Sequence, residues 1–323
     1  MPQTPQRGDR LTRSPEPEAR GREVGERSPR GTPHGSRIPA DWPTEASLPA
    51  YVCTNCGFWQ RRFERPVSCP LCEDFRHVLP EGGFEFLDLE ELAEAGDRSR
   101  CTWEEIRTGV WRYSLREPLG ISPSGYVIST PEGNVAFEAP ALYDEAALDH
   151  ITSIGGVEFA SASHPHTYGA LWRLQERFDC EVAIHREDLG WARAFRVTMP
   201  FDESVGLPGG LTLVNTGGHF GGHTVLHDPE NRRLYIGDAV KLELDPADPT
   251  GRTADGISTH KAFVRRIPLT PGETRRYREV FSGLDFTETF TPFEQCANIG
   301  KNEVLGLLDT QLETRPFVEA LPL

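Results

Sequence analysis

The chain has 323 residues, with 34 Lys and Arg against 49 Asp and Glu, and therefore a formal net charge of −15. This length allows one large and one small domain, and the acidic surface predicts that neither nucleic acid nor an anionic membrane is the main partner, since both are polyanions. No segment approaches the roughly 18 apolar residues of a membrane-spanning helix, and the N-terminus lacks the apolar stretch of a secretory signal.

The first 49 residues are rich in Pro, Gly, Ser and charges of both signs, with no apolar periodicity. Such a segment cannot bury enough surface to offset the entropy of ordering, so we expect a disordered tail over residues 1–49. A shorter C-terminal tail is expected over residues 313–323.

Four of the seven cysteines form two tight pairs, Cys53-Thr-Asn-Cys56 and Cys69-Pro-Leu-Cys72, within residues 50–80. Each pair sits on a turn, marked by Gly57 or Pro70, and two such turns can bring four thiolates into a tetrahedron around Zn²⁺ or iron. This spacing, with an odd number of cysteines, indicates metal ligation in a reducing cytoplasm instead of a disulfide framework. The remaining Cys101, Cys180 and Cys296 are expected to be inert.

This pattern resembles zinc ribbons and the rubredoxin-like module of rubrerythrins, which has C-x-x-C-G and C-P-x-C turns. Iron would imply electron transfer, whereas zinc would clip together about 30 residues that cannot form a core alone. In the iron module a glycine usually follows the fourth cysteine, where this chain has the acidic Glu73. The resemblance therefore favours structural zinc, with iron as the alternative at either metal site of the chain.

Residues 81–106 are expected to form a connector. Leu87, Leu89 and Leu92 predict a short helix, and Thr102 with Glu105 matches a capping box that predicts a second one. Three tryptophans are expected to pack between the cysteine module and the following domain, namely Trp59, Trp103 and Trp111.

Strands and helices alternate over residues 107–312. Residues 126–129 and 135–137 flank a turn at 131–134 and predict a hairpin. Apolar patterning predicts further strands at 157–160, 182–184, 211–214, 224–227 and 234–236, and helices at 144–154, 168–178 and 271–281. Two strand-rich halves with outer helices suggest an α/β fold of the αββα sandwich type, although periodicity alone also fits other α/β layers.

Three segments that follow predicted strands contain candidate metal ligands. The first is Ser163-His164-Pro165-His166-Thr167-Tyr168-Gly169, the second places His219 in a glycine-rich stretch from Thr216 to His223, and the third ends at Asp238. Two histidines at i and i+2 on a loop can turn toward one ion, and a third from a glycine-rich loop completes a three-nitrogen face. The fourth position is then open for a water, whose pKa falls to about 7 on zinc.

In order and context, these segments resemble the metallo-β-lactamase superfamily over about residues 107–300. The resemblance implies that His164, His166 and His219 hold a metal and that Asp238 contacts it. The sequence also looks like a group of bacterial proteins of this fold in which a ribbon precedes the domain and the motif S-H-P-H-x-Y-G occurs.

The pattern departs from the superfamily signature H-x-H-x-D-H at Tyr168 and Gly169, the positions that normally hold a second metal. A late G-H-G loop is also absent, and Thr291-Pro292-Phe293-Glu294-Gln295-Cys296 stands near its place. A site with one metal is therefore expected. Substitute ligands for a second metal stay open, and they are His185, His223, His260 and Glu294.

These residues predict a metal-dependent hydrolase that uses a metal-activated water on a small-molecule ester, thioester, lactone or amide. Asp238 would assist the water and Tyr168 would donate a proton to the leaving group. One alternative is a redox protein with an iron-loaded ribbon, similar to flavodiiron proteins, although His166 stands where those proteins need a glutamate. The other is a non-catalytic binding protein of the same fold.

Overall fold

A computed structural model of the chain describes residues 48–314 and 321–322, all within the unit Pro43–Leu323. The predicted N-terminal tail lies outside the described residues up to position 47, and so does most of the segment 313–323. The limits of the predicted domains stay predictions. None of the helices among the described residues is long and apolar enough to cross a membrane.

The first large sheet has seven strands in the order β10-β9-β8-β7-β6-β5-β4. The strands from β4 to β7 pair antiparallel, whereas those from β7 to β10 pair parallel. Parallel neighbours need a crossover connection. Helix α2 (Glu145–Ser153) connects β7 to β8, α3 (Leu171–Phe178) connects β8 to β9, and a segment with a 3-10 turn (Arg186–Trp191) connects β9 to β10. The strands are β4 (Cys101–Arg107), β5 (Val110–Leu115), β6 (Gly125–Ile128), β7 (Val135–Phe137), β8 (Phe159–Ser161), β9 (Glu181–His185) and β10 (Met199–Phe201).

The second large sheet has six strands in the order β11-β12-β13-β14-β17-β18. These are β11 (Ser204–Gly206), β12 (Thr212–Asn215), β13 (Thr224–Asp228), β14 (Arg233–Tyr235), β17 (Glu288–Phe290) and β18 (Gln295–Cys296). Two helices accompany it, α4 (Pro271–Gly283) and α5 (Lys301–Thr314). A smaller sheet follows β14 and joins β15 (Lys241–Leu244), β16 (Ala254–Ser258) and β19 (Leu321–Pro322).

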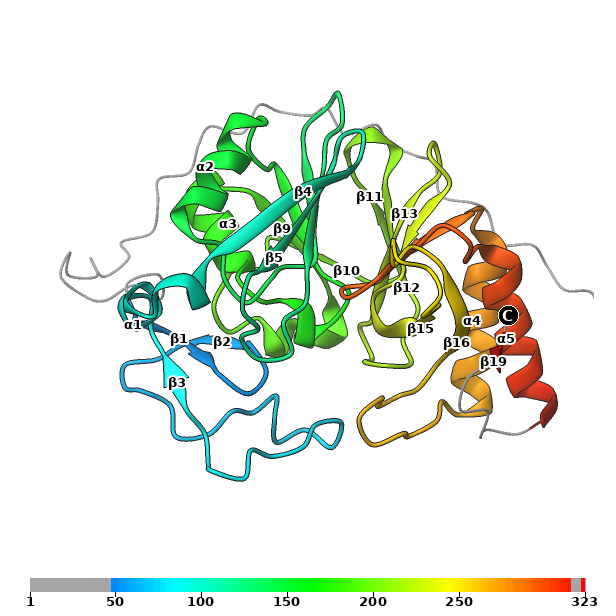
Figure 1. The fold of residues 1–323 in the computed structure, drawn as a ribbon, viewed down its shortest axis with the longest axis horizontal. Coiled ribbons are helices and arrows are strands. Elements are labelled where there is room, and N and C mark those ends of the chain that lie inside the picture. The colour runs from blue at the N-terminus through cyan, green and yellow to red at the C-terminus, as the bar shows by residue number, and fades with distance from the viewer. Residues whose placement is uncertain (1–47, 315–320, 323) are drawn as a thin grey trace, which may run out of the picture. The chain divides into compact units, whose positions relative to one another are not determined.

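Alternate residues of the central strands enter different apolar cores, as a period of two requires. In β6, Tyr126 and Ile128 belong to the core shared by the two large sheets, whereas Val127 belongs to the core under α2 and α3. In β14, Tyr235 faces the shared core and Leu234 faces the core under α4 and α5. The layers therefore run helix, sheet, sheet, helix (Figure 1), and the predicted αββα sandwich is confirmed.

The cysteine module has its own small sheet and packs tightly on the sandwich. Its strands are β1 (Ala50–Cys53), β2 (Trp59–Arg61) and β3 (Phe86–Leu87), paired antiparallel. Trp59 on β2 is buried, donates from Nε1 to the carbonyl of Ala141 at 2.6 Å, and lies with its ring 5.1 Å from that of Trp172. Trp59 therefore packs between module and domain as predicted, whereas Trp103 and Trp111 instead pack against His150.

The predicted hairpin and most of the predicted strands and helices are present within a few residues. The helix near Leu89 is α1 (Leu89–Glu94), capped by Asp88 and Glu91. The helix expected from Thr102 and Glu105 is wrong, because both residues lie on β4. There Thr102 Oγ1 donates to the carbonyl of Ser114 on β5, so pairing along a long antiparallel ladder outweighs a local capping pattern.

Helix α5, which follows the helix expected at 271–281, was not predicted. Its buried residues Val304, Leu307 and Leu308 follow the i, i+3, i+4 spacing of a helix face. That spacing is the signal that could have predicted α5.

Replacing Trp59 with alanine tests how firmly the module is attached. Losing a buried tryptophan leaves a cavity, so Trp59→Ala is expected to lower the free energy of unfolding by about 3–5 kcal/mol in chemical denaturation. Trp103→Ala is the matched control, because Trp103 is 36% exposed and should cost clearly less. Equal losses for the two variants would contradict a shared core between module and domain.

Candidate metal centres

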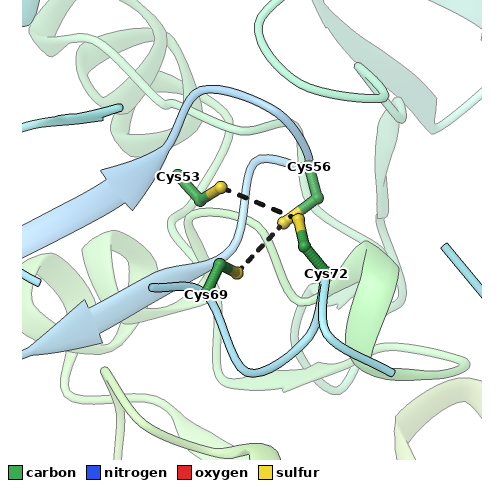
Figure 2. A group of neighbouring side chains, drawn as sticks. All are labelled: Cys53, Cys56, Cys69 and Cys72. Carbon is green, nitrogen blue, oxygen red and sulfur yellow. Dashed lines mark hydrogen bonds between the residues drawn. The ribbon is translucent and has the colours of Figure 1, made fainter. Parts of the chain in front are cut away.

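The four cysteines of the module converge on one point. Their Sγ atoms all lie within 4.8 Å of one another, with Cys53 and Cys72 at 3.8 Å and Cys56 and Cys69 at 3.6 Å (Figure 2). A tetrahedron of thiolates with metal–sulfur bonds of about 2.3 Å has edges of about 3.8 Å. All four side chains are buried. The cysteine centre therefore has the dimensions of a four-thiolate metal site.

Matching backbone turns hold the two pairs. The residue after each pair donates its N–H to the carbonyl of the pair's first cysteine, Gly57 to Cys53 at 2.8 Å and Glu73 to Cys69 at 3.0 Å. Asn55 Nδ2 also lies 3.3 Å from Cys72 Sγ and can donate to it. Such hydrogen bonds to sulfur orient the thiolates and stabilise their negative charge.

The histidine centre joins two loops that are far apart in sequence. His164 and His166 follow β8 on a 3-10 turn (Pro165–Thr167), and His219 lies on the loop between β12 and β13. One ring nitrogen from each of the three lies within 4.8 Å of the other two. All three Nε2 atoms are buried and have no hydrogen-bond partner among the described residues. Buried polar atoms are rarely left unpaired, so the donor set fits a metal ion.

Outer contacts and burial prepare these imidazoles as ligands. Ser163 Oγ lies 2.7 Å from His164 Nδ1, and His219 Nδ1 donates to the carbonyl of His260 at 3.3 Å. Contacts at Nδ1 fix the ring and leave Nε2 for a metal. Burial lowers the pKa of His219 to about 3 and the pKa of His166 well below its usual value. These two rings are therefore neutral at pH 7, as ligation requires.

Asp238 completes this arrangement from the 3-10 turn (Gly237–Ala239) that follows β14. Its Oδ2 lies 3.5 Å from His164 Nε2 and 3.7 Å from His219 Nε2. Burial raises the pKa of Asp238, but the neighbouring His164 and His219 outweigh that effect and hold the pKa below its usual value. The structure thus brings together the four predicted residues of this centre, three imidazoles and one carboxylate.

A cavity of about 310 Å³ opens onto this centre. His166, His219 and Asp238 form part of its wall, and Glu294 also lines it. Most of the remaining wall is apolar and comes from Ile121, Val240, Ala262, Phe263, Val264 and Phe293. The cavity therefore offers a carbon-rich surface beside a cluster of potential metal ligands.

Tyr168 and Gly169 contribute nothing to this cavity. The Tyr168 side chain is buried in the core under α2 and α3, with its ring 5.5 Å from that of Phe195, so its position gives no support to a proton-donating role. Gly169 has a φ of +38°, and a Cβ there would lie 2.4 Å from the carbonyl oxygens of Ala139 and Pro140. The backbone therefore excludes a ligand side chain at this position.

The other histidines weighed as substitute ligands do not join the three-histidine group. His223 is buried behind it, with its ring 5.5 Å from that of His164 and its Nδ1 2.7 Å from Thr216 Oγ1. His185 accepts from the Glu187 N–H, and the His260 ring lies against Phe263. Glu294 lines the cavity, where burial raises its pKa.

Glu138 supports the first histidine loop, and no sequence motif predicted it. Its side chain is 1% exposed, its backbone has a φ of +61°, and its Oε2 accepts from the Ser163 N–H at 2.9 Å. A non-glycine residue in this backbone region is strained and persists only where its surroundings require it. Burial raises the pKa of Glu138 to about 7.

Replacing Glu138 with glutamine tests this burial in metal-free protein. Because the folded pKa of about 7 exceeds the value of 4.5 expected when unfolded, Glu138 favours folding below pH 4.5 and loses that contribution as pH rises through 7. The loss is on the order of 3 kcal/mol. Glu138→Gln should remove it, so denaturation curves of the variant should depend less on pH between 4.5 and 8. Identical pH profiles for both proteins would count against a buried, protonated Glu138.

Comparison with known proteins gives relatives of low sequence identity. No family model matches the chain. The chain is 26% identical to the uncharacterized protein YmaE of Bacillus subtilis (strain 168) over 270 residues, which cover 79% of this chain and 93% of that one.

Among solved structures, a metallo-β-lactamase from Pontibacter korlensis is 17% identical, with a TM-score of 0.46 over 66% of this chain and 100% of that one. The flavodiiron protein from Giardia intestinalis is 13% identical, with a TM-score of 0.46 over 66% of this chain and 58% of that one. The sheets, helices and motif positions of this chain give it a metallo-β-lactamase-like fold, preceded by a four-cysteine module.

Proposed function

We propose that this protein is a metal-dependent hydrolase that cleaves an ester, thioester, lactone or amide bond of a small molecule at the histidine centre. The observation that carries the proposal is the set of three buried imidazole Nε2 atoms, unpaired among the described residues, that converge with Asp238 beside a cavity. In the same proposal the four cysteines hold a structural zinc.

His164, His166 and His219 would hold a zinc ion, which when bound supplies an activated water and polarises a carbonyl oxygen. Asp238 would accept a hydrogen bond from a water in this centre and orient it. Glu294 lines the same cavity, where burial raises the pKa of its carboxyl group, and it would donate a proton to the leaving group. Glu294 therefore takes the role that the sequence suggested for Tyr168.

The local backbone supports the proposal that the histidine centre binds one metal ion and not two. The ligand positions of a second metal are filled by a buried tyrosine and by Gly169, where carbonyl oxygens leave no space for a side chain. The apolar wall of the cavity favours a substrate with a hydrocarbon group next to the bond that is cleaved.

The metal content of the cysteine centre distinguishes a structural role from electron transfer. We expect zinc there, and therefore no strong visible absorption in the protein as isolated, because Zn²⁺ has a filled d shell. Replacing both Cys69 and Cys72 with serine should remove about one zinc per chain by elemental analysis, whereas Cys180→Ser should not. Strong visible thiolate-to-iron bands would instead support the redox alternative.

Replacing His219 with alanine tests the hydrolase. Wild-type protein is expected to hold about two metal ions per chain, and His219→Ala about one, with hydrolysis of a panel of nitrophenyl esters, thioesters and lactones lost. His227→Ala is the matched control, because His227 does not line the cavity and its Nε2 donates to the carbonyl of Asp285 at 2.8 Å. Full turnover by metal-depleted His219→Ala, or two bound metals without hydrolysis of any substrate in the wild type, would contradict the proposal and favour a binding protein.

A further inference from the structure

The segment that follows the fourth cysteine reaches the histidine centre. Arg76 and His77 line the cavity beside His166 and His219, although they belong to the cysteine module. The His77 ring lies 4.9 Å from that of His166. The carbonyl of His77 accepts from Arg265 Nε at 3.0 Å, which joins this segment (light blue in Figure 1) to the gold loop that contributes the Ala262–Val264 side of the cavity.

Phe220 packs against both the cysteine centre and the histidine centre. It comes from the loop between β12 and β13, yet it is a member of the apolar cluster formed by the module's residues Cys53, Cys56, Phe58, Cys69, Leu71, Cys72 and Phe86. Its ring lies 5.5 Å from that of His164, 5.1 Å from that of His166 and 5.5 Å from that of His219. A single buried side chain thus packs on the cysteine cluster and on all three candidate ligands.

Arg76 fastens this loop to the module. Its guanidinium lies between two rings, 4.3 Å from the centroid of Phe75 and 4.0 Å from that of Phe220. Its Nε donates to the carbonyl of His219 at 2.7 Å, and its Nη1 donates to Asp74 Oδ1 at 2.7 Å. Asp74, two residues after Cys72, also accepts from the Arg76 N–H at 3.0 Å and so fixes the arginine's own backbone.

The loop that carries His219 depends on contacts from outside itself. Gly217 and Gly218 precede His219 with positive φ angles, and such residues have many backbone conformations when they are not held. The His219 N–H donates to Tyr277 Oη at 3.1 Å, and the Gly222 N–H donates to Asp188 Oδ1 at 3.2 Å. The bond from Arg76 and the packing of Phe220 are the contacts that reach this loop from the module.

We propose that the cysteine module is an integral part of the histidine centre, and that Arg76 is a positioning residue which sets the loop of His219. It follows that filling the cysteine centre strengthens metal binding at the histidine centre, and that the reverse coupling has the same size. This inference rests on the two proposed metal centres, but not on hydrolysis, because it concerns the affinity of a ligand set and not a reaction.

The test is a Co²⁺ titration of metal-free, full-length protein, followed by absorption. Four thiolates give Co²⁺ intense sulfur-to-metal bands, whereas imidazole and carboxylate ligands give only weak bands, so both centres are observed in one sample. In Arg76→Ala, the cysteine centre should fill as in the wild type. The dissociation constant of the histidine centre should rise on the order of tenfold, within the usual range of coupling between sites.

Two further variants make the result specific. Phe220→Leu keeps an apolar side chain but removes the ring beneath Arg76, and it should weaken the histidine centre in the same direction. If circular dichroism shows that Arg76→Ala does not fold, the Co²⁺ affinity of Phe220→Leu tests the positioning role in its place. Arg278→Ala is the matched control, because this exposed arginine on α4 pairs with Asp309 on α5. Its two Co²⁺ affinities should equal those of the wild type.

The outcomes separate this inference from the proposed function. If wild-type protein shows only the thiolate bands and no second Co²⁺ site, the histidine centre itself is wrong. If both sites fill, but Arg76→Ala and Phe220→Leu bind the second Co²⁺ as tightly as Arg278→Ala, the histidine centre stands and the positioning role of Arg76 is overturned.

Discussion

The structure around the histidine centre depends on three buried imidazole nitrogens. These nitrogens have no hydrogen-bond partners among the described residues. Each unpaired buried polar atom costs about 1–3 kcal/mol, so in the absence of a bound ion the fold must keep these rings in place by contacts elsewhere. For His164 and His219, those contacts are made at ring Nδ1 or at the backbone that carries the ring. They include Ser163 at His164, and Tyr277 and the carbonyl of His260 at His219.

These supporting contacts come from separate parts of the structure. Glu138 follows β7 and accepts from the first loop, Tyr277 lies on α4 and accepts from the second, and Arg76 comes from the cysteine module. Because each loop is held from a different element, the ligand geometry depends on the assembled sandwich and on the module, and not on either loop alone. Such a distributed support is what an accurately placed metal site requires.

The sequence predicted the parts of this protein whose signal is local. The two cysteine pairs, the H-x-H segment, the glycine-rich stretch at His219 and the segment that ends at Asp238 carry short spacings with a geometric reason. The apolar patterns predicted the strands and helices, but they did not by themselves distinguish an αββα sandwich from other α/β layers. Thr102 shows the limit of local signals, since strand pairing with β5 outweighed its capping pattern. Arg76, Phe220 and Glu138 were not predicted as site residues, because their roles depend on which distant segments meet, and no spacing in the sequence reports that.

The main chain around Gly169 limits which substitutions could add a second metal site. Two carbonyl oxygens, from Ala139 and Pro140, occupy the space that any side chain there would need. Placing metal-ligating side chains at positions 168 and 169 would therefore not by itself create a two-metal centre, because the main chain after Glu138 would have to move first. That main chain also carries the carboxylate that supports Ser163. A protein engineer, or natural selection, would have to rebuild the support of the first histidine loop before a second set of ligands could be placed beside it.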